Sequence, residues 1–131
     1  MRAGIEFPAG MAALGGVRSC VLERFDENAL CVTLESAEDS EACLILGDVA
    51  RLIPDGGAEL AEEDIRQLGG WQDGGCGVFC RMGIPRGDPG AAGFDTDRLV
   101  LVNFRTGLGM ERDRPWLGFV PFSALAERRS G

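Results

Sequence analysis

The sequence contains no histidine, no closely paired cysteines and no long apolar run. Without histidine, the chain lacks the most common metal ligand and the most common general base of enzymes. No apolar stretch approaches the roughly 20 residues that a membrane-spanning helix needs, and the first residues lack the apolar core of a signal peptide. We therefore expect a protein without metal or cofactor that makes no membrane contact and stays in the cytoplasm.

The spacing of the five cysteines fits neither a zinc site nor a disulfide framework. Cys76 and Cys80 are one position too far apart for a CxxC pair. The remaining three, which are isolated, are Cys20, Cys31 and Cys43. An odd number of cysteines in a chain without a signal peptide indicates reduced thiols. We interpret Cys80 as a small core residue, with a redox role for the Cys76/Cys80 pair as the alternative.

Acidic residues clearly outnumber basic ones in this chain. There are 21 Asp and Glu against 13 Lys and Arg, which gives a formal net charge of −8 and an isoelectric point near 4.5. Such a chain repels nucleic acids and anionic membranes and suits a basic protein partner. Solubility alone also favours a net charge of this kind. We therefore exclude direct binding to DNA or RNA, and the charge has either a solubility role or a binding role.

Apolar patterning predicts a series of short strands. The clearest alternation places Leu30, Val32 and Leu34 on one face. Strands that recur every 8–12 residues or so favour an antiparallel meander, barrel or sandwich over βαβ units. We predict a mostly β fold, a small antiparallel β-barrel-like single domain over residues 1–131 with one or two short helices. The expected strands are 5–7, 17–23, 29–35, 42–46, 78–84, 98–104 and 116–122; helices are expected at 62–68 and 124–129, and 47–53 fits a helical turn or a strand.

Residues 78–103 form the centre of this prediction, as two strands joined by a loop rich in proline, glycine and aspartate. Every second residue from Val78 to Ile84 is apolar, which predicts that Ile84 is buried. The second strand is apolar on both faces, as is typical of a central strand, so Leu101 is expected in the core. Proline cannot donate to a strand ladder, so Pro8 is expected to end the first strand of the chain.

The clearest predicted helix begins with three acidic residues, Glu62, Glu63 and Asp64. Acidic side chains in a first turn interact favourably with the helix dipole. Gly69 stands where a glycine commonly ends a helix, whereas Ala61 is a weak N-cap. Stabilisation of the helix is the simplest role for these charges, and partner binding is the alternative.

Four stretches of the sequence, taken in order, resemble the flagellar assembly factor family, FliW. They are FPAGM, CVTLESAEDSEACLIL, IPDGGAELAEEDIRQLG and VFCRMGIPRGDPGAAGFDTDRLVLVN. Together they extend from about Phe7 to Asn103, and the last one matches the family's strand, Ile-Pro-x-Gly-Asp-Pro turn and following strand. The chain departs from the family pattern at Asp95 to Arg98 and again after Asn103.

The resemblance implies a compact β-barrel-like protein without catalytic activity that binds two partners in turn. One partner is flagellin, which is held in the cytoplasm before export. The other is CsrA, a small dimeric RNA-binding protein that blocks translation of the flagellin message. Export of flagellin then frees the factor to bind CsrA and relieve the repression. Such a partner switch requires only differences in affinity.

Acidic residues in segments expected to be exposed are our candidate partner contacts: Glu59, Glu62, Glu63, Asp64 and Asp88. A CsrA-type regulator carries basic surface that holds RNA phosphates. An acidic protein bound beside that surface lowers its positive potential, which weakens RNA binding without occupying the same groove. Two alternatives stay open: a secretion or assembly chaperone with a different client, and a small enzyme that uses Cys80 or clustered carboxylates. The absence of histidine weighs against the enzyme.

Overall fold

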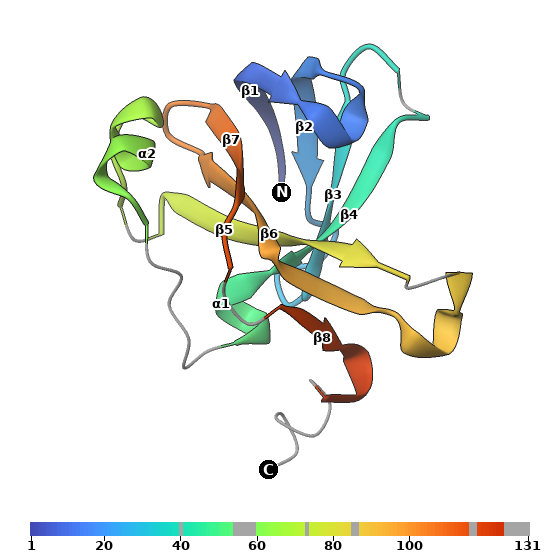
Figure 1. The fold of residues 1–131 in the computed structure, drawn as a ribbon. Coiled ribbons are helices and arrows are strands. Elements are labelled where there is room, and N and C mark those ends of the chain that lie inside the picture. The colour runs from blue at the N-terminus through green and yellow to red at the C-terminus, as the bar shows by residue number, and fades with distance from the viewer. Residues whose placement is uncertain (40, 54–59, 73, 85–86, 116–117, 125–131) are drawn as a thin grey trace.

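Eight strands form one sheet, and seven of them close into a barrel (Figure 1). In the computed structural model the described residues are 1–39, 41–53, 60–72, 74–84, 87–115 and 118–124. The strands are β1 (Arg2–Met11), β2 (Val17–Glu23), β3 (Cys31–Ser36), β4 (Cys43–Asp48), β5 (Cys76–Gly83), β6 (Gly93–Asn103), β7 (Leu108–Asp113) and β8 (Phe119–Pro121). The helices are the 3₁₀ turns η1 (Ala12–Leu14) and η3 (Pro89–Ala91) and the α-helices α1 (Val49–Leu52) and α2 (Glu62–Gln67). No helix among the described residues is long and apolar enough to span a membrane.

The barrel order is β5-β4-β3-β2-β1-β7-β6, and β6 pairs with β5 to close it. Neighbouring strands are antiparallel, apart from a short parallel contact in which Glu6 of β1 pairs with Leu108 of β7. Strand β8 pairs with the first residues of β6 and extends the sheet beyond the barrel. The predicted fold class, a mostly β protein with a small antiparallel barrel and short helices, is confirmed.

The predicted central strand pair is the β5–β6 hairpin, in which Val78 pairs with Leu101. Strand β6 begins at Gly93, five residues earlier than expected. Its first three residues pair with both β5 and β8, although they include a charged side chain. A register shift follows, since Cys80 pairs with Leu99 while Arg81 pairs with Asp95. Polar residues at this bulge interrupt the apolar pattern, so the start of β6 could not be predicted from that pattern.

One other prediction about the strands is wrong, and one strand was not predicted. Strand β1 continues through Pro8 to Met11. The register between β1 and β2 shifts between Glu6 and Met11, so the missing donor of Pro8 falls at an irregularity and removes no regular ladder bond. The charged strand β7 was not predicted, because Arg112 and Asp113 hide its alternation.

The predicted helix at 62–68 is confirmed as α2, and the open segment 47–53 contains the helix α1. Asp48 caps α1, because its Oδ1 accepts a hydrogen bond of 3.2 Å from the backbone of Ala50. Of the predicted final helix, 124–129, all but Ala124 lies outside the described residues.

Two apolar clusters form the core, one inside the barrel and one outside it against the helices. The inner cluster includes Ile5, Phe7, Leu22, Leu34, Phe79, Val100 and Val102, and the outer cluster includes Val49, Leu52, Leu68, Cys80, Phe94, Leu99, Leu101 and Val120. Strand β6 contributes alternate residues to both, which explains why it is apolar on both faces. Leu101 is buried as predicted. Ile84 is 48% exposed, so its predicted burial is wrong: it follows the end of β5, beyond both clusters.

Candidate partner-binding surface

Asp64, in the first turn of α2, joins the helix to strand β7. Its Oδ1 accepts a 2.7 Å hydrogen bond from Nε of Arg112, and its Oδ2 lies 3.1 Å from Nη2 of Arg114. The Asp64 side chain is only 5% exposed. The prediction that Asp64 lies on the surface is therefore wrong. One helical turn separates it from Leu68, so both side chains lie on the face of α2 that packs against the barrel.

Asn103, the last residue of β6, holds the other end of α2. Its buried side chain donates hydrogen bonds of 3.0 Å to the carbonyl oxygens of Leu68 and Gly70, and it accepts two from the β6–β7 turn. Gly69 ends the helix with φ at 82°. A Cβ at Gly69 would lie 2.7 Å from Cγ2 of Thr106, so only glycine fits between the helix and this turn.

The contacts of Asp64 and Asn103 hold α2 in a fixed position beside β7 (Figure 1). Glu62 and Glu63 are exposed on this helix. These are the two candidate contacts that the structure brings together. Glu59 lies outside the described residues. Asp88 is exposed and caps η3, where its Oδ1 accepts a 3.0 Å hydrogen bond from the backbone of Gly90. In Figure 1, η3 is at the tip of the β5–β6 hairpin, on the other side of the barrel from α2, so Asp88 is not part of the same patch.

A cavity of about 530 Å³ opens next to α2, and we call it the α1–α2 cavity. Leu60 and Trp71, which lie two residues before and four residues after α2, form part of its wall. The rest of the lining comes from α1, the neighbouring strands and their turns: Arg24, Asp48, Val49, Ala50, Arg51, Gly74, Cys76, Gly77, Val78, Phe79 and Phe104. Mostly apolar walls with a few polar groups are typical of a site that accepts an apolar side chain.

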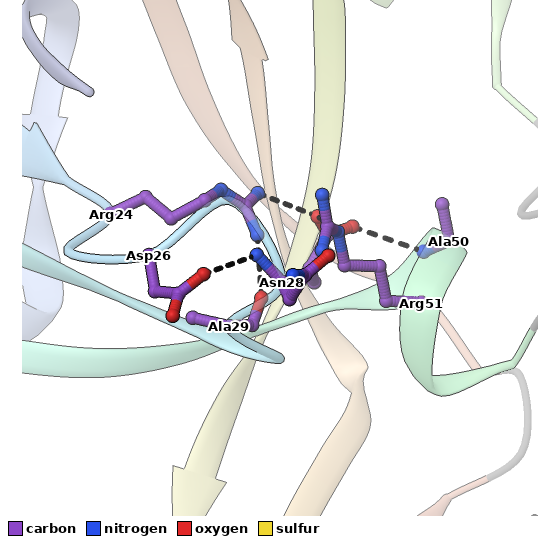
Figure 2. Close-up of polar contacts among 7 residues, drawn as sticks. Arg24, Asp26, Asn28, Ala29, Ala50 and Arg51 are labelled. Carbon is purple, nitrogen blue, oxygen red and sulfur yellow. Dashed lines mark hydrogen bonds and ion pairs between the residues drawn. The ribbon is translucent and has the colours of Figure 1, made fainter.

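The polar part of the α1–α2 cavity is an ion pair between Arg24 and Asp48. Their Nη2 and Oδ2 atoms are 2.6 Å apart, and the side chains are 11% and 13% exposed. Arg24 also donates a 2.7 Å hydrogen bond to the carbonyl of Ala29, and Arg51 approaches the same carboxylate to 3.5 Å (Figure 2). This network ties the β2–β3 turn to α1 and leaves Arg51 as the cation nearest to solvent.

Sequence reasoning missed the Arg24–Asp48 pair because β3 lies between the two residues in the chain. One local signal was present. An aspartate directly before Val49 and its helical neighbours is a favoured N-cap, which would have placed Asp48 at the start of α1. No comparable signal marks Arg24.

The buried thiols of Cys20 and Cys80 are poorly suited to nucleophilic chemistry. Burial raises the pKa of Cys80 to about 12, and burial together with the nearby Glu6 and Glu111 carboxylates raises the pKa of Cys20 to about 11. Neutral thiols are weak nucleophiles and weak metal ligands. All five cysteines are free in the structure. Among the described residues, no group of three or more Cys, Asp or Glu side chains is arranged to hold a metal ion. The enzyme alternative that uses Cys80 therefore has no support from the geometry.

The described residues thus form a small closed barrel that presents an acidic helix beside a cavity with mostly apolar walls. No protein-family model matches the chain, and no curated protein matches it in sequence. The fold is similar to a solved structure described as the crystal structure of the flagellar assembly factor FliW, with a TM-score of 0.72 and 13% sequence identity. The match covers 90% of this chain and 82% of that chain. At this identity the likeness establishes the fold, so the FliW resemblance is confirmed for the architecture.

Proposed function

We propose that this protein is a non-enzymatic flagellar assembly factor that binds flagellin and antagonises a CsrA-type translational regulator in the cytoplasm. The main support is the FliW-like fold over 90% of the chain, which agrees with the order of the motifs from Phe7 to Asn103. A protein that exchanges partners requires binding surfaces of different affinity rather than a reactive group. The neutral thiols of Cys20 and Cys80 agree with this interpretation.

Glu62 and Glu63 are the residues to which we assign contact with the regulator. They are exposed on a helix held by Asp64 and Asn103, so little backbone order has to be gained on binding. Exposed charges act over roughly 8–10 Å at ordinary ionic strength. The acidic face of α2 must therefore lie close to the basic surface of the regulator to weaken its hold on RNA. The α1–α2 cavity beside it can accept an apolar side chain of the regulator.

Calorimetry tests this proposal with the CsrA-type regulator from the same cell, added alone and saturated with RNA. We expect the protein to bind the regulator, to weaken its binding to RNA, and to show no affinity for RNA itself. Absence of heat and of co-elution with both forms would overturn the proposal. A complex with flagellin alone would instead support the alternative of an export chaperone.

Charge reversal locates the contact. The double variant Glu62→Lys/Glu63→Lys is expected to bind the regulator more slowly and with a flatter salt dependence, because charges near an interface mainly steer association. Glu38→Lys/Glu41→Lys is the matched control: it changes the net charge by the same amount in the exposed β3–β4 turn. Glu59 and Asp88 stay predictions, and Asp88→Lys tests whether the hairpin tip also contacts a partner.

A further inference from the structure

Arg81 of β5 carries a buried donor that has no partner. Its Nε is shielded from solvent and forms no hydrogen bond. None of the ion pairs between described residues includes Arg81. Buried polar groups are almost always hydrogen-bonded, and an unpaired donor on a charged group is particularly unfavourable. The residue as a whole is only partly buried, so an acceptor from outside the chain can approach the terminal nitrogens of the guanidinium.

A cavity of about 310 Å³ lies over Arg81, and we call it the Arg81 pocket. Its other lining residues are Met82, Gly83, Ile84, Asp95, Arg98 and Phe119. Asp95 is already paired with Arg98, since the Oδ2 and Nε atoms are 3.2 Å apart. Arg81 is thus the charge in this pocket that is left without a counterion, and an anionic group is the ligand that complements it.

The carboxylates of a neighbouring cavity do not supply the missing counterion of Arg81. Arg81 also lines a neighbouring cavity that contains Glu111 and Asp113. Glu111 accepts a 2.6 Å hydrogen bond from the backbone of Ala12, and neither carboxylate forms an ion pair with Arg81.

The rim of the Arg81 pocket is apolar and exposed. Ile84 and Phe119 line the pocket and are 48% and 39% exposed, so two of the large exposed apolar side chains among the described residues lie together here. Clustered apolar side chains of this kind mark binding surfaces, whereas isolated ones do not.

We propose that the Arg81 pocket binds a segment of a partner protein in which an acidic side chain stands between apolar residues. Arg81 is partly buried beside two exposed apolar side chains, so a glutamate whose backbone lies across Ile84 and Phe119 can extend its carboxylate to the guanidinium. The guanidinium then forms charge-assisted hydrogen bonds to the carboxylate, while the flanking apolar side chains cover Ile84 and Phe119. This contact is separate from the acidic face of α2 and requires a ligand of the opposite charge.

Two short peptides test the proposal on the intact protein: acetyl-Leu-Glu-Leu-amide and acetyl-Leu-Gln-Leu-amide, which differ only in the carboxylate. The readout is the ¹⁵N–¹H signal of Arg81 Nε together with the amide signals of Ile84 and Phe119. We expect these signals to shift progressively with the glutamate peptide, at the millimolar concentrations typical of fragments. The glutamine peptide should bind at least about fivefold more weakly, because it leaves the guanidinium without a counterion.

Variants supply the control. Arg81→Gln should abolish the preference for the glutamate peptide, whereas Arg66→Gln, on the exposed face of α2, should retain it. The comparison of the two peptides on the unmodified protein does not depend on either variant folding. Equal shifts with both peptides, or no shift of the Arg81 signal at about 10 mM peptide, would overturn the proposal. Because the regulator is not used, this result is independent of the proposed function.

Discussion

Oδ1 of Asp64 lies 2.7 Å from Nε of Arg112, and this contact joins helix α2 to a strand 48 residues further along the chain. Asp64→Asn removes the negative charge and leaves Arg112 and Arg114 without their shared counterion. Breaking a buried ion pair costs about 3–5 kcal/mol. Both arginine side chains are about a third exposed, so solvent reduces this cost. We therefore expect the unfolding free energy to fall by roughly 2–3 kcal/mol. Urea denaturation measures this loss.

The control for this variant is Glu63→Gln, which makes the same chemical change one position earlier on the exposed face. Surface substitutions of this kind usually alter stability by less than about 0.5 kcal/mol. In addition, Asp64→Asn should weaken regulator binding although Glu62 and Glu63 are intact, because the helix that carries them loses its position. Equal denaturation midpoints for the two variants would show that Asp64 does not hold α2.

Leu101 and Ile84 provide a test of the strand faces. Leu101 is 1% exposed in the outer cluster, so Leu101→Ala is expected to cost about 2–5 kcal/mol through lost burial and a cavity. Ile84 is 48% exposed beyond the end of β5, so Ile84→Ala should cost less than about 1 kcal/mol. Thermal melting of both variants measures the difference. A large destabilisation by the Ile84 variant would mean that this side chain is buried in solution.

Ile84 also shows where sequence patterning stops being informative. Alternation from Val78 onwards correctly predicted the strand, but it cannot show that the register shifts after Cys80 and that the strand ends at Gly83. The bounds of β2 and the existence of α2 were predictable because both depend on local patterns and end signals.

Contacts between distant segments were not predictable in the same way. The burial of Asp64 depends on Arg112 and Arg114, and nothing in the acidic first turn of α2 indicates that these arginines lie opposite it. Likewise, the unpaired state of Arg81 follows from the pairing of Asp95 with Arg98 across the bulge. The fold was therefore accessible from sequence to a greater extent than the candidate sites.

The buried thiols predict a loss of stability at alkaline pH. The chain contains no lysine and no tyrosine, so cysteines are the only side chains expected to titrate between about pH 9 and 11. Burial raises the pKa of Cys20 to about 11 and that of Cys80 to about 12, above the value of about 8.5 for an unfolded chain. The unfolded state therefore releases these protons first, and each such thiol lowers the unfolding free energy by up to about 1.4 kcal/mol per pH unit.

The contribution of the neutral, buried thiols to the unfolding free energy is fully present below about pH 8.5. It decreases as the pH rises towards the pKa values of Cys20 and Cys80 in the folded state. Urea denaturation at steps from pH 8 to 10.5 measures the decrease. Replacing Cys80 with alanine should flatten the curve, whereas a Cys43→Ala variant, at an exposed position, should flatten it less. A stability that does not change over this range would mean that the two thiols are accessible to solvent in the native state.

Gly93, the first residue of β6, determines whether β8 can lie against the barrel. A Cβ at this position would lie 2.7 Å from Cα of Pro121 and would meet the carbonyl of Val120, and backbone atoms cannot move aside as a side chain can. We expect Gly93→Ala to displace β8 and to destabilise the protein by about 1–3 kcal/mol.

The matched control is Gly4→Ala in β1, where an added Cβ has no neighbour within 4 Å and should leave stability nearly unchanged. Hydrogen exchange at Val120 separates local from global effects. The displaced strand should exchange faster in Gly93→Ala at conditions where β2 and β3 stay protected.

Since Phe119 of β8 forms one wall of the Arg81 pocket, the same variant should also reduce binding of the glutamate peptide. Unchanged exchange at Val120 together with unchanged peptide binding would show that β8 tolerates the added methyl group and that its position does not depend on Gly93.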